Sequence, residues 1–237
     1  MEMILSPANI DFILVNYYSE DYALIAVESI YRYTKSNFNI ILIDNSRDKK
    51  LLQNKFKNYN KKNLFIIDGF EQESPSERFL KPIKMHSTNG GQYGPGSLYH
   101  NKAFNLGIKL CKSKYICHLD IDSLFLTYWE NDILSLLKEN LFIASQMSRN
   151  IAREYFIIWD RLKFEKYKLL PDLSWIDTCG NLTKFANDNK LPFKVTRKLS
   201  NGEYYHFHLG RGTSLEQYGQ VSKKQEYIQK WNSFYNI

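Results

Sequence analysis

The chain has 237 residues, of which 43% are hydrophobic and 24% charged. That balance is enough to bury a core and excludes a disordered or fibrous protein, so we expect one globular domain. Lys and Arg number 32 against 25 Asp and Glu, which gives a formal net charge of +7. Such an excess favours phosphate-bearing ligands, nucleic acid or an anionic membrane face, and does not choose among them.

The cysteines and the N-terminus indicate the compartment. Cys111, Cys117 and Cys179 contain no C-x-x-C pair, which favours reduced thiols over a disulfide framework or a zinc knuckle. No signal peptide is recognisable, and no apolar run approaches the roughly 18 residues of a membrane span. We therefore expect a cytoplasmic protein without a transmembrane segment, or one that is peripheral at the inner membrane face through its basic surface.

The first half alternates short apolar runs with amphipathic stretches. Strands are predicted over 12–15, 38–43, 63–67 and 114–119, and helices around 23–30 and 103–110. Short buried strands separated by helices predict a parallel sheet with right-handed crossovers. The segment 69–97 is rich in Gly and Pro and has no periodicity, so a long functional loop is predicted there.

The second half is less regular, and no internal repeat or linker divides the chain. Helices are predicted near 128–138, from about 175 to 189 and around 227–235, and strands at 141–145 and 203–207. We therefore predict a single α/β domain over 1–237.

Carboxylates follow two of the predicted strands. Asp120 and Asp122 come directly after 114–119, where open α/β sheets bind ligands. Two close carboxylates repel each other unless a cation neutralises them, and Mg²⁺ or Mn²⁺ would do so while bridging a diphosphate. Asp44, after 38–43, could accept a hydrogen bond from a ribose or a base. The alternative for Asp120 and Asp122 is an ordinary acidic strand end or Asx turn, and the alternative for Asp44 is a turn followed by a helix cap.

Four segments in order resemble the signature of family 2 glycosyltransferases with the GT-A fold. They are DFILVNYYS (11–19), ILIDNS (41–46), NKAFNLGI (101–108) and KYICHLDID (114–122). The resemblance covers roughly the first 145 residues well and the rest only in broad plan. It implies a Rossmann-like, mostly parallel central sheet flanked by helices, with a nucleotide-sugar-binding half (1–125) and an acceptor-binding half (126–237).

The resemblance implies metal-dependent transfer of a sugar, with inversion, from a nucleotide-sugar, expected to be a UDP-sugar, to a hydroxyl of a glycan or another acceptor. Asp44 would contact the nucleobase or ribose, and Asn16 and Tyr17 would line the nucleotide pocket. Asp122, assisted by Asp120, would hold Mn²⁺ or Mg²⁺ on the diphosphate and so stabilise the leaving group.

Further candidates lie around the glycine-rich segments. His100, just before the predicted helix, could meet the donor sugar or diphosphate, or be a capping or solvated residue. Asn101 and Lys102 stand where the family often has an arginine, which leaves the contact with the donor phosphate open. His206 and His208 would share one side of a strand, near where many GT-A enzymes complete the metal shell. His208 is the preferred ligand and His206 the alternative; both could also be ordinary strand histidines.

Two more residues have a functional and an ordinary interpretation. Arg211, between two glycines, could bind a diphosphate with its guanidinium fork, or be a solvated turn residue. An inverting transferase needs a general base for the acceptor hydroxyl. Asp177 stands where the resemblance places that base or an acceptor-binding acid, and its alternative role is a helix N-cap.

Other functions are less compatible with the sequence. A nucleotidyltransferase or a nicotinamide oxidoreductase should have a glycine-rich loop after the first strand, where this chain has Asn16-Tyr-Tyr-Ser19. A non-catalytic nucleic-acid-binding module fits the charge and the many tyrosines, but it leaves the strand-end carboxylates unexplained. A nucleic-acid acceptor, such as a modified base on phage DNA, stays open, as does the oligomeric state.

Overall fold

The computed structural model describes residues 8–46, 48–69, 87–88, 91–92, 95–148, 150–153, 155–168, 180–208 and 229. Four sequence predictions fall wholly or largely on residues outside these ranges: the roles of Asp177 and Arg211, the long loop over 69–97, and the C-terminal helix apart from Gln229. The division into two functional halves also stays a prediction.

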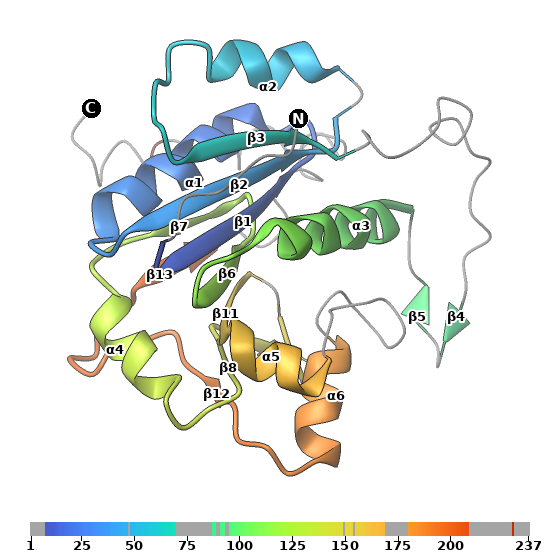
Figure 1. Ribbon diagram of the computed structural model, residues 1–237, viewed down its shortest axis with the longest axis vertical. Coiled ribbons are helices and arrows are strands. Elements are labelled where there is room, and N and C mark those ends of the chain that lie inside the picture. The colour runs from blue at the N-terminus through green and yellow to red at the C-terminus, as the bar shows by residue number, and fades with distance from the viewer. Residues whose placement is uncertain are drawn as a thin grey trace.

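A seven-stranded sheet forms the centre of the described part, in the order β12-β8-β11-β6-β1-β2-β3 (Figure 1). β11 runs antiparallel to both of its neighbours, and every other pair in the sheet is parallel. The predicted mostly parallel sheet is therefore confirmed. The strands are β1 (Ile10–Asn16), β2 (Phe38–Asp44), β3 (Leu64–Asp68), β6 (Tyr115–Leu119), β8 (Phe142–Ala144), β11 (Phe156–Asp160) and β12 (Lys194–Val195).

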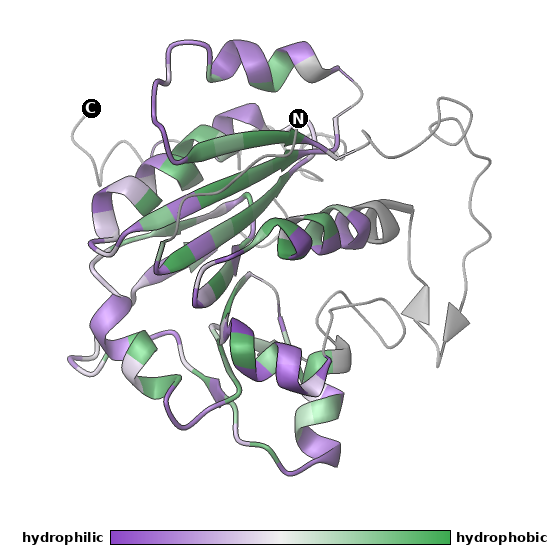
Figure 2. Ribbon diagram, viewed as in Figure 1, coloured by the Kyte–Doolittle hydropathy of each residue, from purple (hydrophilic) through white to green (hydrophobic). Residues whose placement is uncertain are grey.

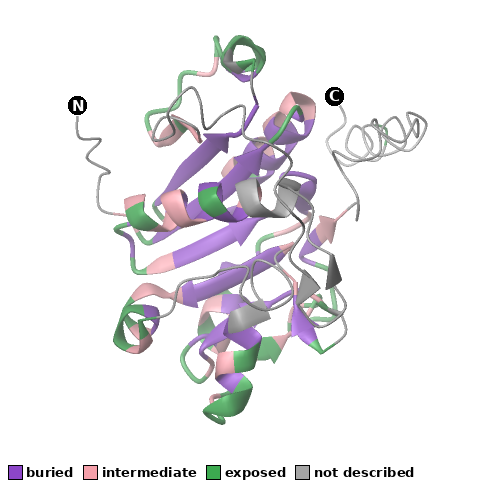
Figure 3. Ribbon diagram, turned by 90° about the vertical axis from the view of Figure 1, so that its right-hand side faces the viewer, coloured by how far each residue is buried: buried purple, intermediate pink, exposed green. Residues whose placement is uncertain are grey.

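Helices cover both faces of this sheet because its strands are apolar on both sides (Figure 2). Phe12 and Leu14 pack in the cluster that includes α1 (Glu20–Tyr33), whereas Ile13 and Val15 pack in the cluster that includes α3 (Pro95–Leu110). The inner strands such as β1 and β2 are buried between these layers, whereas the edge strands β3 and β12 are partly exposed (Figure 3). Two hydrophobic cores therefore fix the sheet, and the edge at which its parallel strands end is held in place.

Gly107 allows α3 to approach the sheet closely. A Cβ at this position would lie 2.6 Å from Cγ2 of Ile13 on β1, well inside van der Waals contact. A side chain here would push the helix outward, so the glycine allows α3 to pack closely on β1 and β2.

The smaller elements complete the fold. The sequence did not predict α2, β7, β11 or α5, and the predicted 203–207 strand lies at β13 instead. α5 begins after Asp160, whose carboxylate accepts the N–H groups of Leu162 (2.9 Å) and Lys163 (3.4 Å) as an N-cap. No helix in the described ranges is long and apolar enough to cross a bilayer. The remaining elements are α2 (Lys49–Lys55), α4 (Glu130–Leu136), α5 (Arg161–Tyr167), α6 (Gly180–Asp188), β4 (Ser87–Thr88), β5 (Gly91–Gln92), β7 (Ser123–Phe125), β9 (Met147–Ser148), β10 (Ile151–Ala152) and β13 (His206–His208).

Candidate active site

A hydrogen-bond network closes the carboxyl ends of β1 and β2. Asn16 and Asp44 are paired across the two strands and both are buried. Asn16 Nδ2 donates to Asp44 Oδ1 (3.0 Å) and to Ser46 Oγ (3.2 Å), and the Ser46 N–H donates to the same Asp44 oxygen (2.9 Å). The last bond is the Asx turn expected as an alternative for Asp44, and Asp48, rather than this turn, caps α2.

Two exposed tyrosines adjoin this network. Tyr17 is 45% and Tyr18 38% exposed, and their ring centroids lie 4.9 Å apart in an edge-on arrangement. Tyr18 has a φ of 52°, a left-handed conformation that non-glycine residues rarely adopt. Its N–H donates to Ser46 Oγ (2.9 Å), which stabilises this backbone. Strained backbone of this kind gathers at functional sites, and here it presents two aromatic rings beside Asp44.

Asp120 and Asp122 lie at the same edge of the sheet, because β6 runs parallel to β1. They belong to a turn in which the Ser123 N–H donates to the Asp120 carbonyl (2.9 Å). The Asp120 N–H in turn donates to the carbonyl of Tyr155, the residue before β11 (3.1 Å). The Asp122 side chain is 8% exposed and that of Asp120 is 18% exposed, so both carboxylates are largely withdrawn from water.

His208 completes a cluster with these two carboxylates. β13 pairs antiparallel with β7 so that His208 lies opposite Ser123, next to Asp122. His208 Nε2 is 3.1 Å from Asp122 Oδ1 and 3.6 Å from Asp120 Oδ2. Tyr155 stacks on the imidazole with ring centroids 3.6 Å apart and an interplanar angle of 17°. The strand pairing and this stacking together orient the imidazole toward the carboxylates.

The cluster fits a divalent cation. The three side chains offer ligand atoms that all lie within 4.8 Å of one another. Two atoms bound to one ion at about 2.1 Å can be at most about 4.2 Å apart, and both His208 distances satisfy this limit. Two carboxylates with one imidazole form a mainly hard donor set, which suits Mn²⁺ or Mg²⁺, the nitrogen favouring Mn²⁺.

His206, the alternative ligand, lies elsewhere. It pairs with Phe125 on β7 and packs against the Phe156 ring at 5.9 Å, inside the core. Burial, followed by the neighbouring charges of His208 and Arg197, lowers its pKa to about 3. In the described part of the chain neither ring nitrogen has a hydrogen-bond partner. The structure thus brings His208, and not His206, to the aspartates.

The start of α3 carries the remaining described candidates. The helix begins at Pro95, so His100 lies within it and the expectations that it precedes or caps the helix are wrong. Asn101 is buried, and its Oδ1 accepts from Asn105 Nδ2 (2.7 Å). Its Nδ2 is a buried donor without a hydrogen-bond partner among the residues described, and Lys102 is exposed. This end of α3 therefore offers an amide donor and a cation.

Three residues that the sequence analysis overlooked contribute to the site. Ser46 accepts from Asn16 and Tyr18, Tyr155 stacks on His208, and His118 on β6 lies near Asp120. His118 had a sequence signal, since a histidine inside a buried apolar strand is unusual. Ser46 and Tyr155 had none, because each acts through a contact with a distant segment.

Comparisons with known proteins identify the fold. No family model and no curated protein matches the chain. Solved structures do match, with identities of 10–15%. Mannosyltransferase PcManGT from Pyrobaculum calidifontis, in complex with GDP-Man and Mn²⁺, aligns with a TM-score of 0.53, 10% identity, 81% of this chain and 55% of that one.

The other two structures are of S. aureus TarS 1–349. One aligns with a TM-score of 0.54 and 14% identity over 95% of this chain and 65% of that one. The other, in complex with UDP-GlcNAc, aligns with a TM-score of 0.50 and 15% identity over 84% and 57%. This chain thus spans 55–65% of the length of the matched chains. Likeness at such identities establishes the fold, and the chain has the GT-A fold of these glycosyltransferases.

Proposed function

We propose that the protein is a metal-dependent glycosyltransferase that moves a sugar from a nucleotide-sugar to an acceptor hydroxyl. One observation carries the proposal: Asp120, Asp122 and His208 gather ligand atoms for a cation at the sheet edge where the Asn16–Asp44 network also lies. A cation site and a polar network with two adjoining exposed tyrosines, on one edge of a GT-A fold, match the two ends of a nucleoside diphosphate.

The nucleoside end would bind at β1 and β2. Oδ1 of Asp44 accepts from Asn16 and from the Ser46 N–H, and Oδ2 would accept a ribose hydroxyl or a base N–H. Asn16 keeps the carboxylate in place, and the exposed ring of Tyr17 would line the pocket. Donor complexes of the matched structures hold GDP-Man and UDP-GlcNAc; we propose a UDP-sugar for this chain.

The diphosphate end would bind at the carboxylate cluster. Asp120, Asp122 and His208 would hold Mn²⁺ or Mg²⁺, which when bound neutralises the charge that develops on the departing nucleoside diphosphate. Asn101 Nδ2 and the Lys102 ammonium would donate hydrogen bonds to phosphate oxygens. Tyr155 would keep the His208 imidazole in its orientation. Arg211, outside the described ranges, would add a bidentate contact.

The acceptor end rests on the sequence alone. Asp177 would take the proton from the attacking hydroxyl, with inversion at the anomeric carbon. The acceptor would be a glycan or another hydroxyl, a modified nucleic-acid base included, since the net charge of +7 suits either an anionic glycan or a nucleic acid.

The proposal is tested by calorimetric titration of the protein with UDP, GDP, ADP and CDP, each with Mn²⁺, with Mg²⁺ and with a chelator. We expect selective binding of one nucleoside diphosphate, UDP, that disappears with the chelator. Asp122→Asn should weaken this binding at least tenfold. Asp160→Asn is the matched control, because Asp160 lies at the opposite sheet edge and Asn keeps the helix cap.

Two results would contradict the proposal. Binding that persists unchanged in Asp122→Asn would remove the cation assignment. No response to any nucleotide, together with salt-sensitive binding to DNA or RNA, would favour the nucleic-acid-binding module instead.

A further inference from the structure

His118 is a fully buried histidine in the middle of the fold. It lies on β6 between Ile13 of β1 and Ile157 of β11 and is 0% exposed. Its ring faces α3, with the Phe104 centroid at 4.4 Å and the His100 centroid at 5.4 Å. Burying a polar imidazole in such a layer costs free energy unless its nitrogens are engaged, so its position here calls for a polar function.

Asp120 lies between two histidines. Its Oδ1 is 3.9 Å from His118 Nε2, and its Oδ2 is 3.6 Å from His208 Nε2. Each distance is below the limit of about 4.2 Å for two ligands of one ion. The two oxygens of one carboxylate therefore face two different imidazoles, as in a carboxylate that bridges two cations.

His100 supplies a third ligand on the His118 side. The ligand atoms of His100, His118 and Asp120 all lie within 4.8 Å of one another, as do those of Asp120, Asp122 and His208. α3 contributes His100, β6 contributes His118, and the turn after β6 contributes Asp120. Rigid elements hold the two histidines, which is the support that a metal site requires.

We propose that His100, His118 and Asp120 bind a second divalent cation, with Asp120 bridging it to the cation at Asp122 and His208. Two imidazoles and one carboxylate form a nitrogen-rich set, which selects a borderline transition metal such as Zn²⁺ over Mg²⁺. Three protein ligands leave at least one position open for another ligand. His100 then serves a metal rather than the direct donor contact that the sequence suggested.

This inference goes beyond glycosyl transfer. Binding of Zn²⁺ by His100 and His118 requires no nucleotide, no sugar and no acceptor, and neither histidine belongs to the first cation site. It stands even if the transfer proposal fails.

The test is the number of zinc ions bound per chain. Metal-free protein is dialysed against Zn²⁺ alone, and bound metal is measured by elemental analysis. Wild-type protein and the Asp160→Asn control should bind two ions. His100→Asn should bind one, and His208→Asn should also bind one, because each variant removes a ligand of a different site.

Co²⁺ provides a spectroscopic check in the same variants. Its visible absorption reports the coordination geometry of each bound ion, so His100→Asn and His208→Asn should each lose a different part of the wild-type spectrum. Circular dichroism and thermal unfolding confirm that each variant is folded.

Two patterns would overturn the proposal. One ion in wild-type protein, lost in His208→Asn and kept in His100→Asn, would leave only the first site. One ion lost in both variants would show a single shared site. If His100→Asn does not fold, crystals of the zinc-loaded wild-type protein decide the question. Two anomalous peaks flanking Asp120 are expected, and a single peak or none would refute the second site.

Discussion

Aspartates at the two edges of the central sheet have opposite surroundings. At the amino edge, Asp11 of β1 is 0% exposed and accepts four hydrogen bonds, from Asn39 Nδ2 (2.8 Å), from the N–H groups of Lys112 (2.7 Å) and Ser113 (2.8 Å), and from Ser113 Oγ (2.6 Å). At the carboxyl edge, Asp120 and Asp122 face each other and an imidazole.

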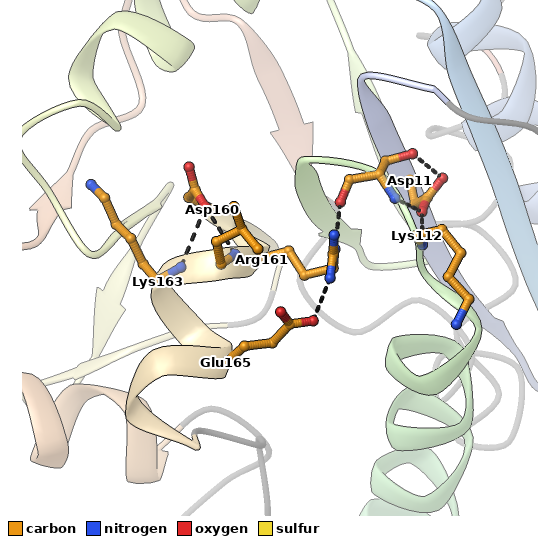
Figure 4. Close-up of polar contacts among 8 residues, drawn as sticks. Asp11, Lys112, Asp160, Arg161, Lys163 and Glu165 are labelled. Carbon is orange, nitrogen blue, oxygen red and sulfur yellow. Dashed lines mark hydrogen bonds and ion pairs between the residues drawn. The ribbon is translucent and has the colours of Figure 1, made fainter.

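Contacts from α5, which follows β11, also hold the amino edge. Arg161 Nε donates to the Ser113 carbonyl (2.9 Å), and the same guanidinium pairs with Glu165 (Figure 4). The segment that binds Asp11 is therefore held from both sides, and its carboxylate is satisfied by the protein itself.

The difference shows that a buried aspartate is not by itself a functional signal. Hydrogen-bond donors surround Asp11, so its charge stabilises the junction between α3 and β6. Groups that can ligate a cation surround Asp120 and Asp122, so their charges fit a bound ion. The type of neighbour, rather than the degree of burial, separates a structural carboxylate from a ligand.

The largest expected effect comes from Asp122→Asn. It should lower the release of nucleoside diphosphate from the donor by about 10²–10³-fold, because stabilisation of the leaving group is lost. Stability without metal should stay the same or rise, since one of two neighbouring negative charges is removed. Donor turnover assays and urea unfolding measure the two quantities. Full activity in this variant would show that the two edges do not differ in function.

Asp11→Asn should have the reverse profile. The variant replaces an acceptor of four hydrogen bonds with a group that accepts fewer and adds a donor, so we expect a loss of about 2–4 kcal/mol in the free energy of unfolding. Zinc or manganese binding by the folded protein should be unchanged. If the variant binds metal more weakly even under conditions where it is fully folded, the amino edge influences the metal site.

Tyr155→Leu probes how the carboxyl edge is held. The variant removes the ring that stacks on His208 at 3.6 Å and keeps the backbone bond from Asp120 to residue 155. We expect about tenfold weaker binding of Mn²⁺, since groups behind a ligand tune its affinity. Tyr155→Phe is the control and should bind as wild type does; equal binding by both variants would exclude an orienting role for the ring.

Ser113→Ala should produce the smallest effect. One of the four hydrogen bonds to Asp11 is lost, while the backbone donors of Lys112 and Ser113 remain. We expect a destabilisation of about 1 kcal/mol, measured by urea unfolding, and no change in metal binding. A loss of unfolding free energy as large as that of Asp11→Asn would mean that the Ser113 hydroxyl alone stabilises the junction between α3 and β6.

The sequence by itself determined the parallel strands and the edge at which the site lies. Apolar runs such as Phe38–Ile43 and the polar residues that end them are local signals, and they depend on the burial of each strand on both faces. Asp44 ends β2, and Asp120 and Asp122 come just after β6, so their position at this edge could be predicted. β11 has a local signal of the same kind, the apolar run over 156–159, and could also have been predicted. α5 has seven residues, too few to show a helical repeat.

Only the tertiary structure decided how distant residues meet. His206 and His208 are equivalent by spacing, and the register of β13 on β7 places His208 beside Asp122 and His206 in the core. Close packing of α3 on the sheet, which Gly107 allows, brings His100 to His118. Such contacts join segments far apart in the chain, and they depend on strand register and helix packing, which local hydrophobic patterns do not specify.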